Sequence, residues 1–514
     1  MAQRVEISVH PNDADEAGLK TVVAKHLGVD VARVHHVVEE RRAIDARKRK
    51  VLIRLRVCVY LDGETPVLDE PTLPSIPTLK GPVRVVVVGA GPAGMFAAWR
   101  LAMAGHRPLV VERGGNVRGR RPALAALNRS GTLDPENNYC FGEGGAGTFS
   151  DGKLYTRVKK GPTRTVLELL AASGAPQQIL IDSRPHIGTN RLPKVVQTLR
   201  DYLIAAGVEF AFDTRVDDFV FDGKTVKGVQ LRDGREVRAD AVVLATGHSA
   251  RDIYELCSRR GIHLESKPYA MGVRIEHPQA MIDEIQYGGL AAHPQLGAAP
   301  YSLKQTVDGI GVYSFCMCPG GFIVPAATQS GQLVVNGMSP SKRNSKFANS
   351  GFVVTVDEAV YGDGVLDGLT YQAEVEKAAY AAGGEGLKAP AQRVDDFVAG
   401  RVSDSLPECS YRPGLVSSDL HKVLPERIAG PMRSALKFFD SARMRGYVSN
   451  EAVLVGVESR SSAPIRIPRD AASRESLSHA DLYPTGEGAG FAGGIVSAAL
   501  DGLRVADAIA RKLG

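Results

Sequence analysis

The sequence predicts an α/β protein with three parts: a small N-terminal α/β domain, a domain built on a parallel sheet, and an α+β domain inserted into the second. Three observations predict this organisation. A proline-rich stretch follows the first sixty residues. A β-branched run, Val83 to Val88, leads into a glycine loop and a helical segment. A second glycine-rich stretch, "YPTGEGAGFAGGI" (Tyr483 to Ile495), lies almost at the C-terminus.

Composition narrows the class of protein. A chain of 514 residues suggests two or three domains, and 44% hydrophobic with 23% charged residues is typical of globular proteins. A net charge of +6 is weak evidence for a nucleic-acid partner. No apolar run reaches the roughly 18–20 residues of a membrane span, and the N-terminus lacks a signal-peptide core, so we expect a cytoplasmic protein without membrane contact. Six scattered cysteines predict no metal site, and Cys316 and Cys318 are interpreted as reduced thiols.

Residues 1–62 are predicted to form the N-terminal domain. "RVEISVH" is typical of a strand, and a helix should follow, with Asp13 as N-cap and Gly28 as its stop. Alternating apolar residues in "KVLIRLRVCVY" predict a half-buried strand. The run "ERRAIDARKRK" has two interpretations, a nucleic-acid surface or a solvated hairpin end whose acids dilute the charge. The second is favoured because no aromatic platform accompanies the basic residues. Five prolines make residues 63–82 an extended, semi-rigid linker.

The glycine loop after Val88 fits a dinucleotide-binding fingerprint. Gly89, Gly91 and Gly94 have the spacing G-x-G-x-x-G, which provides a tight turn, an approach for a pyrophosphate, and close packing of helix on strand. A helix from about Pro92 to Ala104 should follow. "RPLVVE" is then a second strand, which ends in an acid, Glu112, at the distance expected of a ribose ligand. The fingerprint predicts a Rossmann-type domain but does not separate NAD from FAD.

Three further segments complete the pattern. "FGEGGAGTFSDGKL" (141–154) is a second loop rich in glycine and hydroxyl groups. Several short strands with turns at "DGK" and "RDGR" then lead to a buried strand, Ala241 to Ala245, which runs into "TG". The C-terminal "GEGAGFAGGI" precedes a helical run. In this order the motifs resemble the glutathione-reductase-like FAD flavoproteins. "GEGGAGTFSDGKL", "CMCPGG", "VESRSSAPIRI" and "GEGAGFAGGI" resemble, more closely, a bacterial group of uncharacterised FAD-dependent dehydrogenases, over nearly the whole chain.

This resemblance implies a non-covalently bound FAD and explains the C-terminal glycines. In the superfamily the equivalent acid, here Glu487, binds the ribityl or phosphate end of FAD, and the N-terminus of the next helix points at the flavin. A helix N-terminus carries about half a positive charge, which favours the flavin edge that becomes negative on reduction. The predicted cofactor-binding residues are Gly89, Gly91, Pro92, Ala93, Gly94, Glu112, Arg113, Arg120, Gly145, Ser150, Asp151, Gly152, Val216, Ala245, Thr246, Gly247, Gly486, Glu487, Gly493, Gly494 and Ile495.

The FAD-binding domain is predicted to comprise residues 83–265 and 455–514, with a substrate domain at 266–454. Within the latter, "PYAMGVRIEHPQAMIDEIQYG", "YSFCMCPGGFIVPAA" and "GQLVVNGMS" should be strands, and "EGLKAPAQRVDDFVAG" and "HKVLPERIAGPMRSALKFFDSARMRG" should be helical. The polar residues expected nearest the flavin are Arg274, Ser459, Arg460 and Ser461. An ion pair of Glu458 with Arg460 or Arg466 is the alternative interpretation of these charges. His186 and His248 are candidate acid–base groups, with structural roles as their alternatives; the catalytic candidates are therefore Arg460, Arg274 and His186.

The chemistry is narrowed by what is missing from the sequence. The CxxxxC pair of dithiol reductases and a second G-x-G-x-x-G for a nicotinamide nucleotide are both missing, so NAD(P)H would bind only transiently as an electron donor. We expect a flavoenzyme that transfers a hydride or electron pair between FAD and a small organic molecule. One alternative is an RNA-associated flavoprotein, similar to tRNA-modification proteins, that docks through its N-terminal domain. Another is a flavin-bearing structural partner without turnover.

Overall fold

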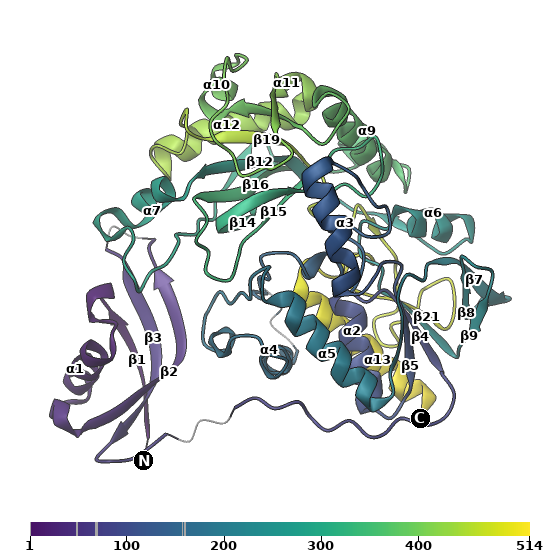
Figure 1. The fold of residues 1–514 in the computed structure, drawn as a ribbon, viewed down its shortest axis with the longest axis horizontal. Coiled ribbons are helices and arrows are strands. Elements are labelled where there is room, and N and C mark those ends of the chain that lie inside the picture. Colours follow the sequence, from purple (N-terminus) through teal and green to yellow (C-terminus); the bar gives the residue numbers. More distant parts are fainter. Residues whose placement is uncertain (1, 48–49, 67–69, 157, 159–160) are drawn as a thin grey trace.

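The computed structural model describes residues 2–47, 50–66, 70–156, 158 and 161–514. Two residues of the predicted hairpin end, Lys48 and Arg49, and the linker residues 67–69 lie outside the described residues. Figure 1 shows three bodies: the N-terminal domain at lower left, a parallel-sheet domain at lower right and a mixed-sheet domain above both. Within the described ranges, every helix is too short or too polar to cross a lipid bilayer.

The N-terminal domain is a three-stranded antiparallel sheet covered by one helix. Its elements are β1 (Gln3–Val9), α1 (Glu16–Leu27), β2 (Val34–Asp45) and β3 (Leu52–Leu61), with strand order β1-β3-β2. The helix begins two residues later than predicted. Asp15, not Asp13, is its N-cap, because the Asp15 carboxylate accepts from the Gly18 N–H at 2.8 Å while Asp13 closes a short 3₁₀ turn. Gly28 ends the helix in the left-handed conformation, as predicted (φ 69°).

The parallel-sheet domain contains five strands in the order β21-β10-β4-β5-β6, all parallel. These strands are β4 (Val85–Val88), β5 (Pro108–Val111), β6 (Glu209–Ala211), β10 (Ala241–Leu244) and β21 (Leu482–Pro484). Alternate residues of β4 face opposite layers. Val85 and Val87 pack with the helices α2 (Pro92–Met103), α5 (Leu192–Ala206) and α13 (Ile495–Leu513) on one face. Val86 and Val88 pack on the other face with the sheet from β7 (Val216–Asp222) to β9 (Glu236–Arg238) and with α6 (Arg251–Arg259). Burial on both faces explains the unbroken apolar run.

The mixed-sheet domain holds eight strands in the order β13-β14-β16-β12-β19-β17-β18, with β15 paired to β14. The bounds are β12 (Tyr269–Pro278), β13 (Lys304–Val307), β14 (Ile310–Pro325), β15 (Val335–Met338), β16 (Phe347–Val356), β17 (Ala389–Arg393), β18 (Leu415–Ser417) and β19 (Val453–Glu458). β19 therefore extends across the domain boundary predicted at residue 454. Helices α9 (Asp367–Ala382), α11 (Leu420–Val423) and α12 (Glu426–Ala442) cover the sheet at the top of Figure 1.

Two segments of this domain differ from the sequence prediction. Gln279–Tyr287, predicted as strand, is helix α7, because Ile282 and Ile285 turn inward at the three-residue spacing of a helix. Ala389–Arg393, predicted as helix, is strand β17, whose hydrogen bonds with β19 outweigh the helical preference of its alanines; only Val394–Ala399 (α10) is helical.

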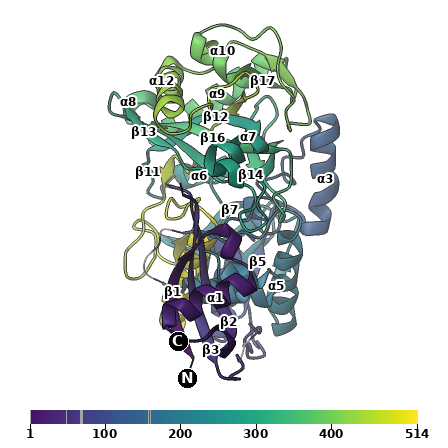
Figure 2. The same ribbon diagram turned by 90° about the vertical axis from the view of Figure 1, so that its left-hand side faces the viewer.

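The remaining elements connect these layers. Helix α3 (Val117–Ser130) extends along the side of the molecule, from the parallel sheet toward β14 (Figure 2). The other bounds are α4 (Thr163–Ala172), β7 (Val216–Asp222), β8 (Thr225–Leu231), β9 (Glu236–Arg238), α6 (Arg251–Arg259), β11 (Glu265–Ser266), α8 (Glu358–Tyr361) and β20 (Ile465–Arg466). β11 pairs with β20, so the chain enters and leaves the mixed-sheet domain side by side.

The N-terminal domain and the described part of the linker contact the rest of the chain. The Leu79 N–H donates to the Ala206 carbonyl at 3.1 Å, so the linker lies against the end of α5. The backbone of Arg42 exchanges hydrogen bonds with Ile181 and Ser183, of 3.0 and 2.9 Å. The described part of the linker therefore packs against the parallel-sheet domain.

Removal of residues 1–80 should leave a folded core that retains FAD but unfolds at a lower temperature. Among the described residues that line the main cavity, none precedes Val88. The truncation nevertheless exposes apolar surface that Leu79 and the N-terminal sheet cover. Flavin content per chain and thermal unfolding measure the two effects. A soluble truncated protein without flavin would contradict the prediction.

Candidate functional site

A cavity of about 1330 Å³ lies where the parallel sheet meets the mixed sheet. Its floor is formed by the loops that follow β4, β5, β10 and β21, at the carboxyl ends of these parallel strands. Its far wall is formed by β14, β15 and the end of β16. Typical ligand pockets have volumes of about 300–1,000 Å³. The cavity is therefore larger than a typical pocket for one small ligand.

The three fingerprint glycines each meet a different requirement. Gly89 has φ 105°, and a Cβ there would lie 2.5 Å from the Ala245 carbonyl oxygen. A Cβ on Gly94 would lie 1.9 Å from the Gly89 carbonyl oxygen, so only glycine allows the helix to approach the strand. Gly91 is different, since no atom of the described residues lies within 4 Å of the place that a Cβ would take. This open space, beside the first turn of α2, is where a pyrophosphate fits.

Glu112 is buried at the end of β5 and holds three loops together. One carboxylate oxygen accepts from the Ala90 N–H at 2.9 Å, and the other accepts from the N–H groups of Gly114 (3.0 Å) and Gly142 (2.9 Å). The side chain also lines the cavity. A carboxylate has about four acceptor positions, so Glu112 keeps capacity for a ribose hydroxyl. Its structural role is one that the fingerprint did not predict.

Arg120 was predicted to bind the cofactor. Instead it holds the second glycine loop (141–154) in place from the side away from the cavity. Its guanidinium is fully buried and donates to the carbonyls of Asn138, Glu143 and Gly145 at 2.6–3.0 Å. Arg120 is not among the residues that line the cavity. A Cβ on Gly142 would lie 2.3 Å from the Arg120 side chain, so the glycine makes room for it. The prediction was wrong because the sequence motif does not show which way the arginine points.

The C-terminal glycine segment is fixed by an acid on the helix that follows it. Asp501, on α13, accepts from the Thr485 hydroxyl at 2.9 Å and from the Gly486 N–H at 2.8 Å. Among the described residues, no atom lies within 4 Å of a Cβ added at Gly493, and the nearest to one at Gly494 is 4.0 Å away. The backbone therefore faces open cavity just before the first turn of a 19-residue helix. Asp501 was not predicted, because it is the seventh residue of a helix with an ordinary amphipathic pattern.

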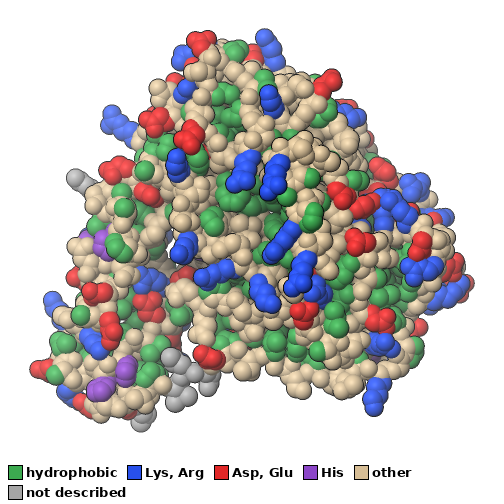
Figure 3. All heavy atoms as spheres, in the orientation of Figure 1, with side chains coloured by type: hydrophobic (Ala, Val, Ile, Leu, Met, Phe, Trp, Pro, Cys, Tyr) green, Lys and Arg blue, Asp and Glu red, His purple; other side chains and the backbone are tan. Residues whose placement is uncertain are grey.

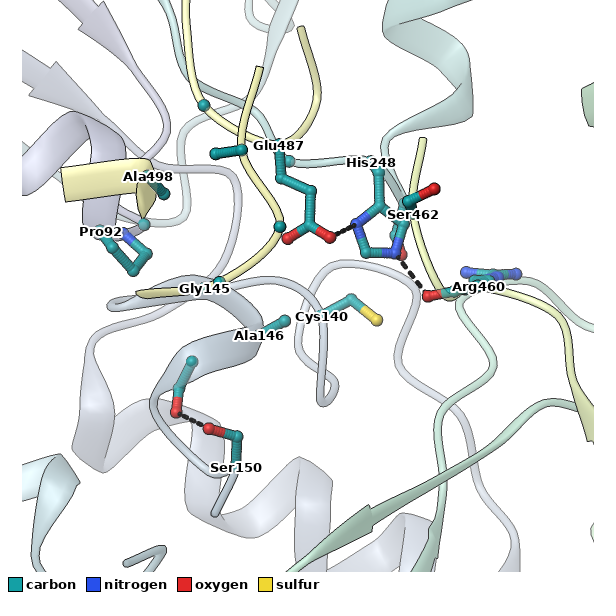
Figure 4. A pocket seen from close by; sticks show the side chains of 18 of the residues that line it. Pro92, Cys140, Gly145, Ala146, Ser150, His248, Arg460, Ser462, Glu487 and Ala498 are labelled. Atoms are coloured by element: carbon teal, nitrogen blue, oxygen red, sulfur yellow. Dashed lines mark hydrogen bonds and ion pairs between the residues drawn. The ribbon is translucent and has the colours of Figure 1, made fainter. Parts of the chain in front are cut away.

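Glu487 and His248 face each other across the cavity floor (Figure 4). The His248 Nδ1 lies 3.4 Å from a Glu487 carboxylate oxygen, and its Nε2 lies 3.1 Å from the Arg460 carbonyl oxygen. Both side chains are partly exposed to the cavity. His248 thus connects the loop after β10 with the C-terminal glycine segment.

Apart from Gly94 and Arg120, the predicted cofactor residues all line this cavity: Gly89, Gly91, Pro92, Ala93, Glu112, Arg113, Gly145, Ser150, Asp151, Gly152, Val216, Ala245, Thr246, Gly247, Gly486, Glu487, Gly493, Gly494 and Ile495. They come from segments about 400 residues apart. The described residues include no cluster of three or more His, Cys, Asp or Glu able to hold a metal ion.

Two of the three catalytic candidates do not line the cavity. Arg274 is fully buried and forms a bidentate ion pair with Glu458 (2.6 and 2.8 Å), so Glu458 does not pair with Arg460 or Arg466 as the alternative interpretation had it. His186 bonds the Ser341 carbonyl at 3.1 Å, and burial with nearby Arg343 lowers its pKa to about 4. Neither lines the cavity.

Arg460 does line the cavity, but its guanidinium is directed into the protein. It donates to both oxygens of Glu376 at 3.0 Å and to the Thr328 hydroxyl at 2.7 Å. Ser459 is fully buried and also donates to Glu376, at 2.6 Å. Ser461 lies at the cavity wall, where its hydroxyl donates to the Ala270 carbonyl at 2.5 Å. Ser459, Arg460 and Ser461 therefore use these donors within the protein, where they stabilise the wall, rather than offer them to a ligand.

The wall opposite the glycine loops was not predicted residue by residue. It includes Cys140, Lys153, Lys304, Tyr313, Phe315, Cys316, Met338 and Thr355. Alternation in β14 could have suggested Tyr313 and Phe315, but not which face of the sheet they occupy. Lys153 directly follows Gly152, which was predicted. Its place at the end of the glycine-rich motif was the only sequence signal that it lines the cavity.

Family comparisons agree with this geometry. Residues 87–123 match an "NAD(P)-binding Rossmann-like domain", 185–301 an "FAD dependent oxidoreductase" and 268–461 an "FAD-dependent protein, C-terminal domain-like". An uncharacterised protein of Clostridium beijerinckii is 40% identical over 97% of both chains. The chain belongs to a family of FAD-dependent oxidoreductases. Residues 1–60 of this oxidoreductase match a domain of unknown function.

More distant relatives of the oxidoreductase share parts of it. Thiamine thiazole synthase of Aeropyrum pernix is 30% identical over 34% of this chain and 58% of that protein. Digeranylgeranylglycerophospholipid reductase of Haloferax volcanii is 24% identical over 40% of this chain and 45% of that protein. Among solved structures, the flavin-dependent brominase Bmp2 aligns over 84% of this chain and 79% of its own, at 15% identity and a TM-score of 0.38.

The residues present fit an FAD. Open backbone at Gly91, Gly493 and Gly494 meets the need for close approach without side chains, and Glu112 offers a carboxylate to ribose. The cavity volume of about 1330 Å³ lies above the roughly 300–1,000 Å³ of typical ligand pockets.

Proposed function

We propose that this oxidoreductase transfers a hydride or electron pair between FAD and a small organic substrate, which binds against the mixed sheet. One observation carries the proposal: a single cavity extends from the glycine loops to the face of β14 and β15. FAD, when bound, supplies the redox chemistry. The protein supplies binding, orientation and the exclusion of water.

The wall opposite the glycine loops suits a substrate with an apolar body. Tyr313, Phe315 and Met338 contribute rings and a thioether, while Thr355 adds a hydroxyl group. Burial raises the pKa of the Tyr313 hydroxyl above its ordinary value, so this group stays protonated at neutral pH. It can therefore donate a hydrogen bond to a substrate oxygen.

The purified protein should be yellow and should release FAD, rather than FMN, into the supernatant after heat or acid denaturation. The expectation follows from the cavity volume and from the glycine loops that line the cavity at the carboxyl ends of the parallel strands. Chromatography of the released flavin against standards identifies it. A colourless protein that cannot be reconstituted with FAD would refute the proposed function.

Reduction by NADH or NADPH should be slow and should require high donor concentrations. The one strong dinucleotide fingerprint is taken up by the FAD site, so a nicotinamide nucleotide would have to bind in the substrate space without a fingerprint of its own. Anaerobic stopped-flow measurement of the oxidised-flavin absorbance, with each donor varied, tests this. Fast reduction that saturates at micromolar donor would contradict it.

Nucleic acid is not part of this proposal, because several described basic residues of the N-terminal sheet are paired. Arg42 pairs with Glu39 at 2.8 Å, and Arg47 and Arg54 share Asp45 at 2.8 and 2.5 Å. Such pairs reduce the positive field that phosphate binding needs.

A further inference from the structure

A cluster of buried charges at the substrate end of the cavity contains more cations than carboxylates. Arg343 and Lys153 approach the same oxygen of Asp151, at 3.0 and 3.4 Å, while the other Asp151 oxygen has no hydrogen-bond partner within the described residues. Arg274 pairs with Glu458 immediately behind. Among the residues that the structure describes, three cations therefore face two carboxylates in this cluster. His186 adds no charge at neutral pH, because burial lowers its pKa to about 4.

Lys153 is the cation of this cluster that reaches the cavity. Its side chain is 30% exposed, against 18% for Arg343 and 0% for Arg274. Its ammonium group lies 3.3 Å from the Cys318 sulfur, a weak acceptor, and shares Asp151 with Arg343. Burial alone would lower the pKa of Lys153, but Cys318 and Asp151 together hold it above its ordinary value. The ammonium group is thus charged and partly buried, and among the described residues it shares its carboxylate partner, Asp151, with Arg343.

Other cations on the cavity wall differ from Lys153. Arg460 is bonded to Glu376 and Thr328, as described above. Arg113 pairs with Glu136 at 2.5 Å and with Asp252 at 3.0 Å. Lys304, on β13, is exposed to solvent, which compensates its charge. Figure 3 shows Lys and Arg side chains gathered near the centre of one face of the molecule, a distribution that favours the approach of anions.

We propose that Lys153 binds the carboxylate of an organic acid, with the rest of the acid against Tyr313 and Phe315. The proposal rests on the proposed function, in that this acid is taken to be the substrate. The ligand would supply the negative charge that the Asp151 cluster lacks. An apolar wall with one placed cation is also the usual composition of a small-molecule site.

Cys316 provides a built-in reporter for this subsite. It is exposed and lines the cavity, and its backbone has φ 46° at the bulge of β14, whereas Cys318 is buried beside Lys153. Iodoacetate and iodoacetamide have nearly the same size, but only iodoacetate carries a carboxylate. The ratio of their alkylation rates at Cys316 therefore measures the attraction of the site for an anion. The iodoacetamide rate corrects for changes in the reactivity of the thiol itself.

The experiment uses the full-length, FAD-loaded protein and quantifies the Cys316 peptide by mass spectrometry. Lys153→Met should lower the iodoacetate-to-iodoacetamide ratio about tenfold, as expected for loss of one charge-assisted contact. Lys153→Arg should retain most of the ratio, and the ratio at Cys140, elsewhere on the wall, should not change. In the unmodified protein, acetate should protect Cys316 better than acetamide does at constant ionic strength.

Three results would overturn the proposal. They are an unchanged ratio in Lys153→Met, an equal fall in Lys304→Met, and a Cys316 that reacts with neither reagent. If Lys153→Met does not fold, the comparison of acetate with acetamide tests the proposal instead. Equal protection of Cys316 by the two would overturn it. No turnover is required, so a protein without oxidoreductase activity would refute the proposed function while leaving this measurement interpretable.

Discussion

Replacing Glu376 with glutamine should lower the free energy of unfolding by about 3–5 kcal/mol, the range for breaking a buried ion pair. Glu376, on α9, is fully buried and accepts from Arg251 at 2.8 and 3.0 Å and from Arg460 at 3.0 Å. Arg251 begins α6 on the parallel-sheet side, and Arg460 follows β19. One carboxylate thus holds two guanidinium groups from both large domains, and its loss leaves both without a counter-charge.

Urea unfolding followed by circular dichroism measures this effect. Glu374→Gln is the matched control, since Glu374 is exposed on the same helix and should change the stability by less than about 0.5 kcal/mol. Equal stability of the two variants would show that the contacts of Glu376 with Arg251 and Arg460 contribute nothing to the free energy of unfolding.

The effect of Glu376 should also depend on pH in a defined direction. Burial alone would raise the pKa of this carboxyl, but Arg460 and Arg251 outweigh burial and lower it from 4.5 to about 2. A carboxyl with a lowered pKa stabilises the fold above its unfolded-state pKa, and this contribution is lost as the pH falls through the folded-state value. The stability difference between the protein and Glu376→Gln should therefore narrow between pH 4.5 and about 2.

Glu112→Ala should weaken FAD binding by about ten- to a hundredfold, equivalent to the roughly 1.5–3 kcal/mol of one charge-assisted hydrogen bond. The protein itself should also lose stability. The variant leaves the buried N–H groups of Ala90, Gly114 and Gly142 without their acceptor, and each costs about 1–3 kcal/mol before relaxation or water entry. Titration of the apoprotein with FAD and thermal unfolding separate the two effects.

Glu209→Ala is the control for this experiment, because Glu209 is an exposed acid on β6, the neighbouring strand of the same sheet. It should leave FAD affinity unchanged. A folded Glu112→Ala protein with the affinity of the control would show that Glu112 is not a ribose ligand.

The sequence identified the loops on the glycine-rich side of the cavity, because that side is built from backbone and glycine. A tight turn or an open helix terminus imposes a local pattern, as at Gly89, Gly91 and Gly94. The substrate side could not be predicted in the same way. Which arginine pairs with which acid depends on contacts such as Arg274 with Glu458, 184 residues apart. β17 shows the same limit, because its pairing with β19 outweighs local helix propensity.

The side-by-side entry and exit of the mixed-sheet domain have a consequence for how such proteins can diversify. β11 pairs with β20, and β12 pairs with β19. The two segments that connect the domains therefore lie side by side as antiparallel strand pairs. Everything between them could be exchanged for another module without altering the strand order of the parallel sheet. The parallel-sheet domain and the mixed-sheet domain can therefore evolve independently. Homologues with the same glycine loops need not share a substrate.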